Sequence, residues 1–370
     1  MIPTEVYTKT LMSFLTPIRL LLEAPDISEV MINGPDEIFV ERQGKLERSE
    51  ARFPSEQALV AALRCLAQYV GRPLDAEHPI LEARTPDGSR VQAVLAPAAP
   101  SGPLVSIRRF SPDIATPEQL VARGSLTNEA LELLRACVTR RKNLLVAGGA
   151  GSGKTSLLAA ISSLIASDER VVVIEDAHEL RLNGEHVVHL EAQPGDQRSR
   201  GAVSLRTLFR ATLRLRPDRI VIGEVRGAEA LDLVQAMTSG HAGCLSTIHA
   251  SHPEDALGRL ETLALMGCTE LPLFALRAQI VSAVDAIVQT RRLSDGRRII
   301  SHISEVCDLC PQRGYRVRPL FVHELAGDEG PMTFAKPRVA QAPHGAACAD
   351  SSGVHPPNST DSSNARRLEP

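Results

Sequence analysis

The residues best suited to chemistry lie in a glycine-rich stretch near the middle of the chain. Residues 144–156 read LLVAGGAGSGKTS and fit the pattern GxxxxGK[ST], with Gly148, Gly153, Lys154 and Thr155 in register. Glycines at these positions let consecutive backbone N–H groups turn towards phosphate oxygens, and Lys154 adds a full positive charge. We therefore predict a phosphate-binding loop in which Thr155 ligates Mg²⁺.

The sequence around this loop supplies the context that the pattern needs. Residues 143–147 predict a short buried strand, and residues 155–166 predict an apolar helix whose N-terminus carries partial positive charge. A plain glycine turn does not explain a Lys-Thr pair at the first turn of such a helix. The predicted nucleotide-binding residues of the loop are Gly148, Gly149, Ala150, Gly151, Ser152, Gly153, Lys154, Thr155 and Ser156.

Acidic residues follow two later strands. Glu175, Asp176 and Glu179 come at the end of VVVIEDAHEL, and Glu224 comes at the end of RIVIGE. The carboxyl ends of parallel strands open onto the crevice where α/β proteins bind ligands. One carboxylate can hold Mg²⁺ through water and another can polarise the attacking water, whereas the alternative for each is a solvated acidic turn.

Two histidines lie in SGHAGCLSTIHAS. His241 is flanked by glycines at a turn and could sense a terminal phosphate, and His249 follows a predicted strand. A lone histidine is more often a core or capping residue. Cys307 and Cys310 form the one CxxC of the chain, with His302 nearby, so a metal site there is an alternative to two strand-end cysteines.

The composition restricts the class of protein. The 370 residues include 41 basic and 44 acidic side chains, and the net charge is −3. This balance, with 3% aromatics and no Trp, argues against direct nucleic-acid binding. No signal peptide and no run of about 18 apolar residues is evident, so we expect a cytoplasmic protein that meets a membrane only through partners.

The pattern along the chain predicts two domains. Residues 1–110 predict a smaller α+β domain, with a hairpin over 27–40, a helix over 55–71, and strands over 90–95 and 104–110. Residues 111–125 predict a linker. Residues 126–325 predict an α/β domain with parallel strands, and residues 326–370 predict a disordered tail. The strands expected in the α/β domain are 171–174, 187–190 and 220–222.

Four segments in this order resemble the Walker A, Asp box, Walker B and His box of the type II/IV secretion ATPase superfamily. They are GGAGSGKTS, IEDAHEL, LRLRPDRIVIGEVRGAEALD and SGHAGCLSTIHAS, and the resemblance spans about residues 10–325. The segments MINGPD, DGSRV, SIRRF and DALGRLETLALMG are most similar to the tight-adherence (Flp) pilus branch, the CpaF/TadA motors.

This resemblance implies a RecA-like P-loop ATPase core with a PAS-like N-terminal domain, assembled as a homohexamer. It implies ATP and Mg²⁺ as cofactors, and inner-membrane platform proteins of a pilus or secretion apparatus as partners. Glu224 would be the Walker B carboxylate that meets Mg²⁺ with Thr155, Glu175 and Glu179 would position water, and His241 and His249 would sense phosphate. Arg90 in DGSRV and Arg108 in SIRRF would be presented to the nucleotide phosphates.

Two alternatives remain beside the pilus motor. One is a conjugation or type IV secretion ATPase, which the same motifs also fit. The other, of a different class, is a nucleotide-binding scaffold that does not turn over, although Lys154 and Glu224 count against it.

Overall fold

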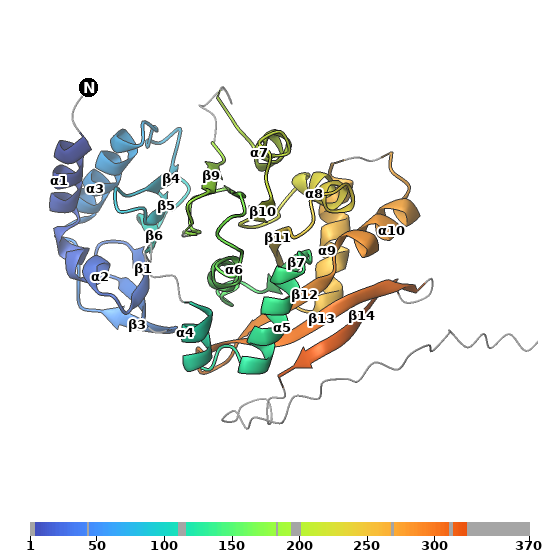
Figure 1. The fold of residues 1–370 in the computed structure, drawn as a ribbon. Coiled ribbons are helices and arrows are strands. Elements are labelled where there is room, and N and C mark those ends of the chain that lie inside the picture. Colours follow the sequence, from blue (N-terminus) through green and yellow to red (C-terminus); the bar gives the residue numbers. More distant parts are fainter. Residues whose placement is uncertain are drawn as a thin grey trace, which may run out of the picture. The chain divides into compact units, whose positions relative to one another are not determined.

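A computed structural model of the chain describes residues 4–42, 44–109, 116–182, 184–193, 201–267, 270–310 and 314–323 (Figure 1). All of these residues belong to one compact unit, which contains two β-sheets. Within these ranges, no helix is both long enough and apolar enough to cross a membrane. The tail predicted over 326–370 lies outside the described residues.

The N-terminal part is built on a six-stranded antiparallel sheet in the order β3-β2-β1-β6-β5-β4. The predicted hairpin is confirmed, because β1 and β2 pair with Ile32 opposite Ile38. In β1, Val30 and Ile32 are buried and Met31 between them is not, as expected for a sheet with one covered face. The strands are β1 (Ile27–Asn33), β2 (Ile38–Arg42), β3 (Lys45–Ser49), β4 (Ile80–Arg84), β5 (Arg90–Val94) and β6 (Leu104–Arg108).

A long amphipathic helix covers this sheet. Helix α3 (Glu56–Tyr69) lies in the range predicted for it, and the Ser55 hydroxyl caps it by accepting a hydrogen bond from the Ala58 N–H. Its apolar residues at helical spacing join the sheet residues in one core, where each buried leucine contributes roughly 1.5–3 kcal/mol. The other N-terminal helices are α1 (Thr4–Phe14), the 3₁₀ turn η1 (Thr16–Ile18) and α2 (Arg19–Glu23).

The second sheet has eight strands in the order β14-β13-β12-β7-β11-β10-β8-β9. The six strands from β12 to β9 are parallel, which confirms the parallel strands predicted at 171–174, 187–190 and 220–222. The antiparallel extension through β13 and β14 was not predicted. The strands are β7 (Leu144–Gly148), β8 (Val171–Glu175), β9 (Val187–Glu191), β10 (Arg219–Ile222), β11 (Leu245–His249), β12 (Ala286–Arg292), β13 (Arg298–Cys310) and β14 (Gly314–Val322).

Helices cover both faces of this sheet. One buried cluster joins one face to α7, α8, α9 and α10, and the other joins the opposite face to α4, α5 and α6. All residues of β7 and β8 are buried, as expected for parallel strands with both faces covered. The helices are α4 (Pro117–Ala122), α5 (Asn128–Thr139), α6 (Lys154–Ser162), α7 (Leu205–Thr212), α8 (Glu229–Thr238), α9 (Pro253–Leu265) and α10 (Leu273–Ala283).

Two local expectations need correction. The stretch predicted as a linker over 111–125 contains α4, because Thr116 and Gln119 form a reciprocal capping box and Pro117 occupies the first helical turn. The helix predicted over 155–166 ends at Ser162. The boundary between residues 1–110 and 126–325 stays a prediction, because the described residues on both sides belong to the same compact unit.

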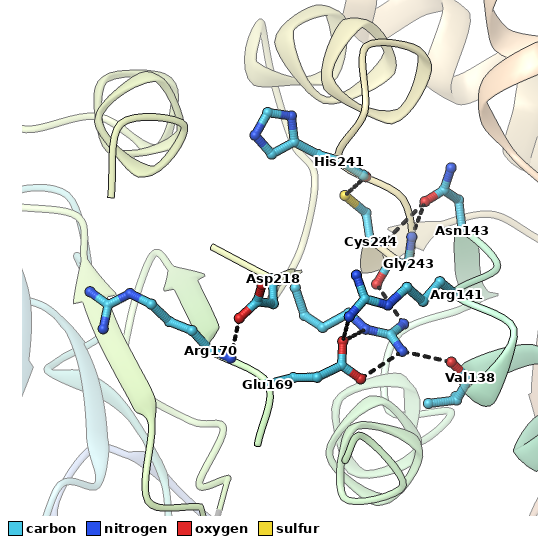
Figure 2. Close-up of polar contacts among 10 residues, drawn as sticks. Val138, Arg141, Asn143, Glu169, Arg170, Asp218, His241, Gly243 and Cys244 are labelled. Carbon is cyan, nitrogen blue, oxygen red and sulfur yellow. Dashed lines mark hydrogen bonds and ion pairs between the residues drawn. The ribbon is translucent and has the colours of Figure 1, made fainter. Parts of the chain in front are cut away.

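A buried arginine joins the strand ends that lie opposite the glycine loop. Arg219 begins β10 and is 2% exposed. It donates to both oxygens of Glu169 (2.7 and 3.1 Å) and to the Val138 carbonyl (2.7 Å). Glu169 also pairs with Arg141 at 2.7 Å, as Figure 2 shows, and the hydrogen bond from Arg219 lowers the pKa of Glu169. The charge on this arginine is therefore matched at close range.

An asparagine completes this network (Figure 2). The side-chain Oδ1 of Asn143 accepts the N–H groups of Gly243 (2.8 Å) and Cys244 (3.0 Å), and its Nδ2 donates to the Ala283 carbonyl (2.7 Å). A Cβ on Gly243 would lie 2.2 Å from a guanidinium nitrogen of Arg219, so that position requires glycine. The network fixes where β7, β10 and β11 begin.

We predict that Arg219→Ala lowers the free energy of unfolding by about 3–5 kcal/mol, because it leaves Glu169 without its main buried partner. Arg214→Ala is the matched control, since Arg214 is exposed in the same connection and should change stability by less than about 0.5 kcal/mol. Urea unfolding of both variants tests this. Equal stability of the two would show that the buried network contributes little.

Candidate functional site

The glycine-rich segment forms the connection between β7 and α6, as predicted. Gly153 immediately precedes α6 with φ +92°, a backbone conformation that favours glycine. Gly148 ends β7, and a Cβ there would lie 2.1 Å from the Thr290 hydroxyl and 2.4 Å from the Ser152 hydroxyl. Glycine at this position therefore lets β12 approach the loop closely.

The side chain of Ser152 supports the loop from inside. Its hydroxyl donates to the Gly149 carbonyl (2.8 Å) and lies 2.8 Å from the hydroxyl of Thr290, which itself donates to the Ala147 carbonyl (3.0 Å). Ser152 is 4% exposed, so its hydroxyl serves the loop and not the solvent. Ala150 and Gly151 form the exposed tip of the loop.

Lys154 is the first residue of α6, and its ammonium group turns back onto the loop. Nζ donates to the Gly149 carbonyl at 2.8 Å. Burial lowers the pKa of Lys154, the positive charges of Arg226 and Arg108 lower it further, and Glu224 acts in the opposite direction. These are the effects expected of a cation among other cations in a partly dehydrated site.

Two arginines that the sequence analysis missed lie against the loop. Arg298 begins β13 and donates from Nε to the Gly151 carbonyl at 2.9 Å. Arg292 ends β12, and one of its nitrogens would lie 3.3 Å from a Cβ on Gly151. Burial lowers the pKa of Arg298, and the charges of Arg292 and Arg108 lower it further. Glu41 on β2 balances this pair at 3.3 Å from Arg292 and 3.6 Å from Arg298.

The two arginines predicted in the N-terminal half lie directly opposite each other. Arg90 on β5 pairs in register with Arg108 on β6. Arg108 is close enough to lower the pKa of both Lys154 and Arg298. Arg90 forms an ion pair with Glu179 at 3.1 Å. Both predicted arginines are thus brought near the loop or the acidic residues around it.

Glu224 follows β10 and lies near Lys154. Its Oε2 accepts a hydrogen bond from Arg226 Nε at 2.7 Å and a second, short contact from the same guanidinium. Arg226 also meets Asp176 at 3.3 Å. Glu229, 5% exposed, accepts the N–H groups of Arg226 and Gly227 at 2.7 Å each, which fixes the turn that carries Glu224.

Glu175, at the end of β8, is 3% exposed. Its Oε1 accepts the N–H groups of Glu179 and Leu180 at 2.9 and 2.8 Å, so it shapes the turn after the strand. Burial raises the pKa of Glu175 to about 7. The carboxyl group can therefore take up or release a proton near neutrality.

Of the two histidines predicted as phosphate sensors, His249 ends β11 and His241 lies in the turn that precedes this strand. In register with β7, Leu245 is opposite Leu144 and His249 is opposite Gly148. His249 therefore lies beside the loop, whereas His241 is drawn with the residues of the buried network in Figure 2. The role of His241 as a phosphate sensor stays a prediction.

Among the described residues, no third metal-ligating side chain clusters with the CxxC pair. Cys307 and Cys310 lie on β13, as does His302, whose Nδ1 is 3.1 Å from the Ser301 hydroxyl. Within the described part of the chain, neither cysteine belongs to a group of three or more His, Cys, Asp or Glu side chains with ligand atoms close together. The strand-end interpretation is favoured.

Comparison with known proteins agrees with this geometry. Residues 14–333 match the family model described as "Type II/IV secretion system protein". The chain is 38% identical to a putative conjugal transfer protein of Mycobacterium tuberculosis, over 77% of this chain and 82% of that protein. It is 36% identical to the type IV secretion system protein PtlH of Bordetella pertussis, over 75% of this chain and 89% of that one.

A solved structure shares the fold. The ATPase DotB of Legionella pneumophila matches with a TM-score of 0.56 at 20% identity, over 77% of this chain and 79% of that one. The glycine loop between β7 and α6 and the acidic residues after β8 and β10 lie within the residues matched by the family model. The chain therefore belongs to the type II/IV secretion system protein family and is an ATPase.

Proposed function

We propose that this ATPase powers a type IV secretion or conjugation apparatus. The sequence analysis favoured a Flp pilus motor, but relatives named for conjugal transfer and type IV secretion support the alternative. The proposal includes a RecA-like core, a PAS-like N-terminal domain, a homohexameric ring, and a cytoplasmic location at the inner membrane through platform proteins. Because the family consists of ATPases, we reject the alternative of a nucleotide-binding scaffold that does not hydrolyse ATP.

One observation carries the ATP site: cationic side chains converge on the glycine loop. Arg108 lies close enough to both Lys154 and Arg298 to lower the pKa of each. Like charges in a partly buried site are unfavourable unless an anion joins them. A triphosphate supplies several negative charges at the N-terminus of α6, where backbone N–H groups also point.

We assign the predicted roles to this arrangement. Lys154 and the loop amides from Gly149 to Thr155 would hold the phosphates. The hydroxyl of Thr155 and the carboxylate of Glu224 are the hard oxygen donors that Mg²⁺ prefers, so this donor set fits the ion. Bound Mg²⁺ would neutralise phosphate charge, and Glu175 would orient or accept a proton from the attacking water.

The N-terminal arginines would link nucleotide to domain movement. Arg108 would contact the phosphates, and Arg90 would position Glu179 through their 3.1 Å ion pair. An arginine suits this task because its fork of donors is rigid and permanently charged. Hydrolysis would then remove the phosphate that joins Arg108 of the six-stranded sheet to Arg298 of the eight-stranded sheet. His249, which lies beside Gly148, would sense the loss of the same phosphate.

We predict that Lys154→Ala weakens ATP binding by about 10- to 100-fold, because it removes a charge-assisted hydrogen bond to phosphate. Glu224→Gln should still bind ATP but scarcely hydrolyse it. Lys142→Ala is the matched control, since Lys142 pairs with Asp285 at 2.7 Å at the other end of β7. Fluorescent-nucleotide titration and phosphate release measure the two steps. Normal turnover by Glu224→Gln would reject its assignment.

We predict that Arg108→Ala lowers turnover by about 10³-fold, the low end for a lost arginine finger, with little change in melting temperature. Arg48→Ala is the control, because Arg48 is an exposed strand residue whose ion pair with Glu37 is long, at 3.6 Å. Phosphate release and thermal unfolding are compared for both variants. Loss of stability in proportion to activity would mean that Arg108 acts only in folding.

Deleting the gene in its host tests the apparatus. We expect loss of DNA or effector transfer, restored by the wild-type gene but not by Lys154→Ala. Transfer at the wild-type rate, together with loss of surface pili, would favour the pilus function instead.

A further inference from the structure

Three side chains that bind metals well meet at the edge of the eight-stranded sheet. Glu175 ends β8, His189 lies on the edge strand β9, and His178 lies in the turn after β8. Val173 is in register with His189, so Glu175 and His189 project from the same face of the two strands. Among the described residues, this is the one group of three whose possible ligand atoms all lie within 4.8 Å of one another.

The local fold prepares these groups for a shared ion. Because Oε1 of Glu175 accepts the Glu179 and Leu180 N–H groups, its Oε2 is left towards His178, whose Nδ1 lies 3.5 Å away. The rings of His178 and His189 meet edge to face with centroids 4.6 Å apart. Hydrogen bonds that orient a ligating carboxylate in this way are typical of metal sites.

The electrostatic setting is compatible with a cation. Glu175 is buried, so a positive charge at Oε2 would compensate its ionised form. Burial lowers the pKa of His189, and the neighbouring His178 lowers it further, which favours the neutral imidazole that metals bind. The nearby guanidinium of Arg170 contacts His186, which is outside this group, with 2.6 Å between Nη1 and Nε2.

The donor set selects the type of metal. Two imidazoles and one carboxylate match the His₂Glu sites of Zn²⁺, whereas Mg²⁺ prefers oxygen ligands alone. Ligand atoms of a tetrahedral zinc ion lie roughly 3.4 Å apart. Ring rotations that move the histidine nitrogens by about 1 Å would therefore close this group around the ion. The fourth position would be left to water.

We propose that Glu175, His178 and His189 bind one Zn²⁺ or a similar divalent transition-metal ion, and that the bound ion inhibits the ATPase by withholding Glu175 from the attacking water. The second half rests on the proposed function of Glu175, whereas the first half does not. This site is separate from the Mg²⁺ site proposed at Thr155 and Glu224, because it uses different side chains.

Metal binding is measured on the full chain without an affinity tag, by competition for Zn²⁺ with a chelating dye and by the visible spectrum of bound Co²⁺. Wild type should bind one ion per chain with a tetrahedral Co²⁺ spectrum, and His178→Ala and His189→Ala should each lose both signals. His186→Ala is the matched control, since His186 lies beside β9 but outside the group. It should bind like wild type.

Either of two results would overturn the site. One is unchanged Zn²⁺ binding by both histidine variants. The other is loss of binding in Cys307→Ser, which would assign the ion to the thiols of Cys307 and Cys310 instead.

Phosphate release in excess Mg²⁺ tests the inhibition. One equivalent of Zn²⁺ should reduce wild-type turnover, a chelator should restore it, and His189→Ala should turn over at the same rate with and without Zn²⁺. Bound Zn²⁺ with unaffected wild-type turnover would reject the inhibitory role. If the chain shows no ATPase activity at all, the proposed function fails while the dye and Co²⁺ measurements still decide the metal site.

Discussion

Partial burial of the cations around the glycine loop is the constraint on which the site depends. Lys154 and Arg298 are half-buried, and each donates a hydrogen bond to a loop carbonyl, that of Gly149 or Gly151. Carbonyl groups compensate a cation only in part, because they carry partial charges. A polyphosphate would replace these contacts with charge-assisted ones, which explains why the loop, α6 and the arginines are assembled in one place.

Residues that stabilise the fold and residues proposed for catalysis lie at opposite ends of the eight-stranded sheet. At the end where the parallel strands begin, the charge of buried Arg219 is matched by Glu169 and the strand positions are fixed by Asn143. At the other end, Glu224 and Lys154 remain partly exposed. Carboxyl ends of parallel strands are where α/β proteins bind ligands, so a rigid opposite end lets the functional end keep charged groups that are partly exposed.

Most features that were predicted correctly depend on local sequence patterns. The loop, the β1–β2 hairpin and α3 each depend on spacing and turn residues within about 20 positions, which a single sequence displays. Arg298 and Thr290 could not be placed this way, because they reach the loop only through the pairing of β12 with β7. The end of β11 at which His241 lies could not be predicted either, because a glycine-flanked turn looks the same at either end of a strand.

The most direct test of this account is a structure of the chain with a non-hydrolysable ATP analogue and Mg²⁺. We expect phosphate oxygens on the loop amides, Lys154 Nζ moved from the Gly149 carbonyl to a phosphate, and Arg108 within hydrogen-bond distance of the phosphates. An analogue bound elsewhere, or one bound at the loop with Lys154 still on Gly149 and Arg108 turned away, would contradict it.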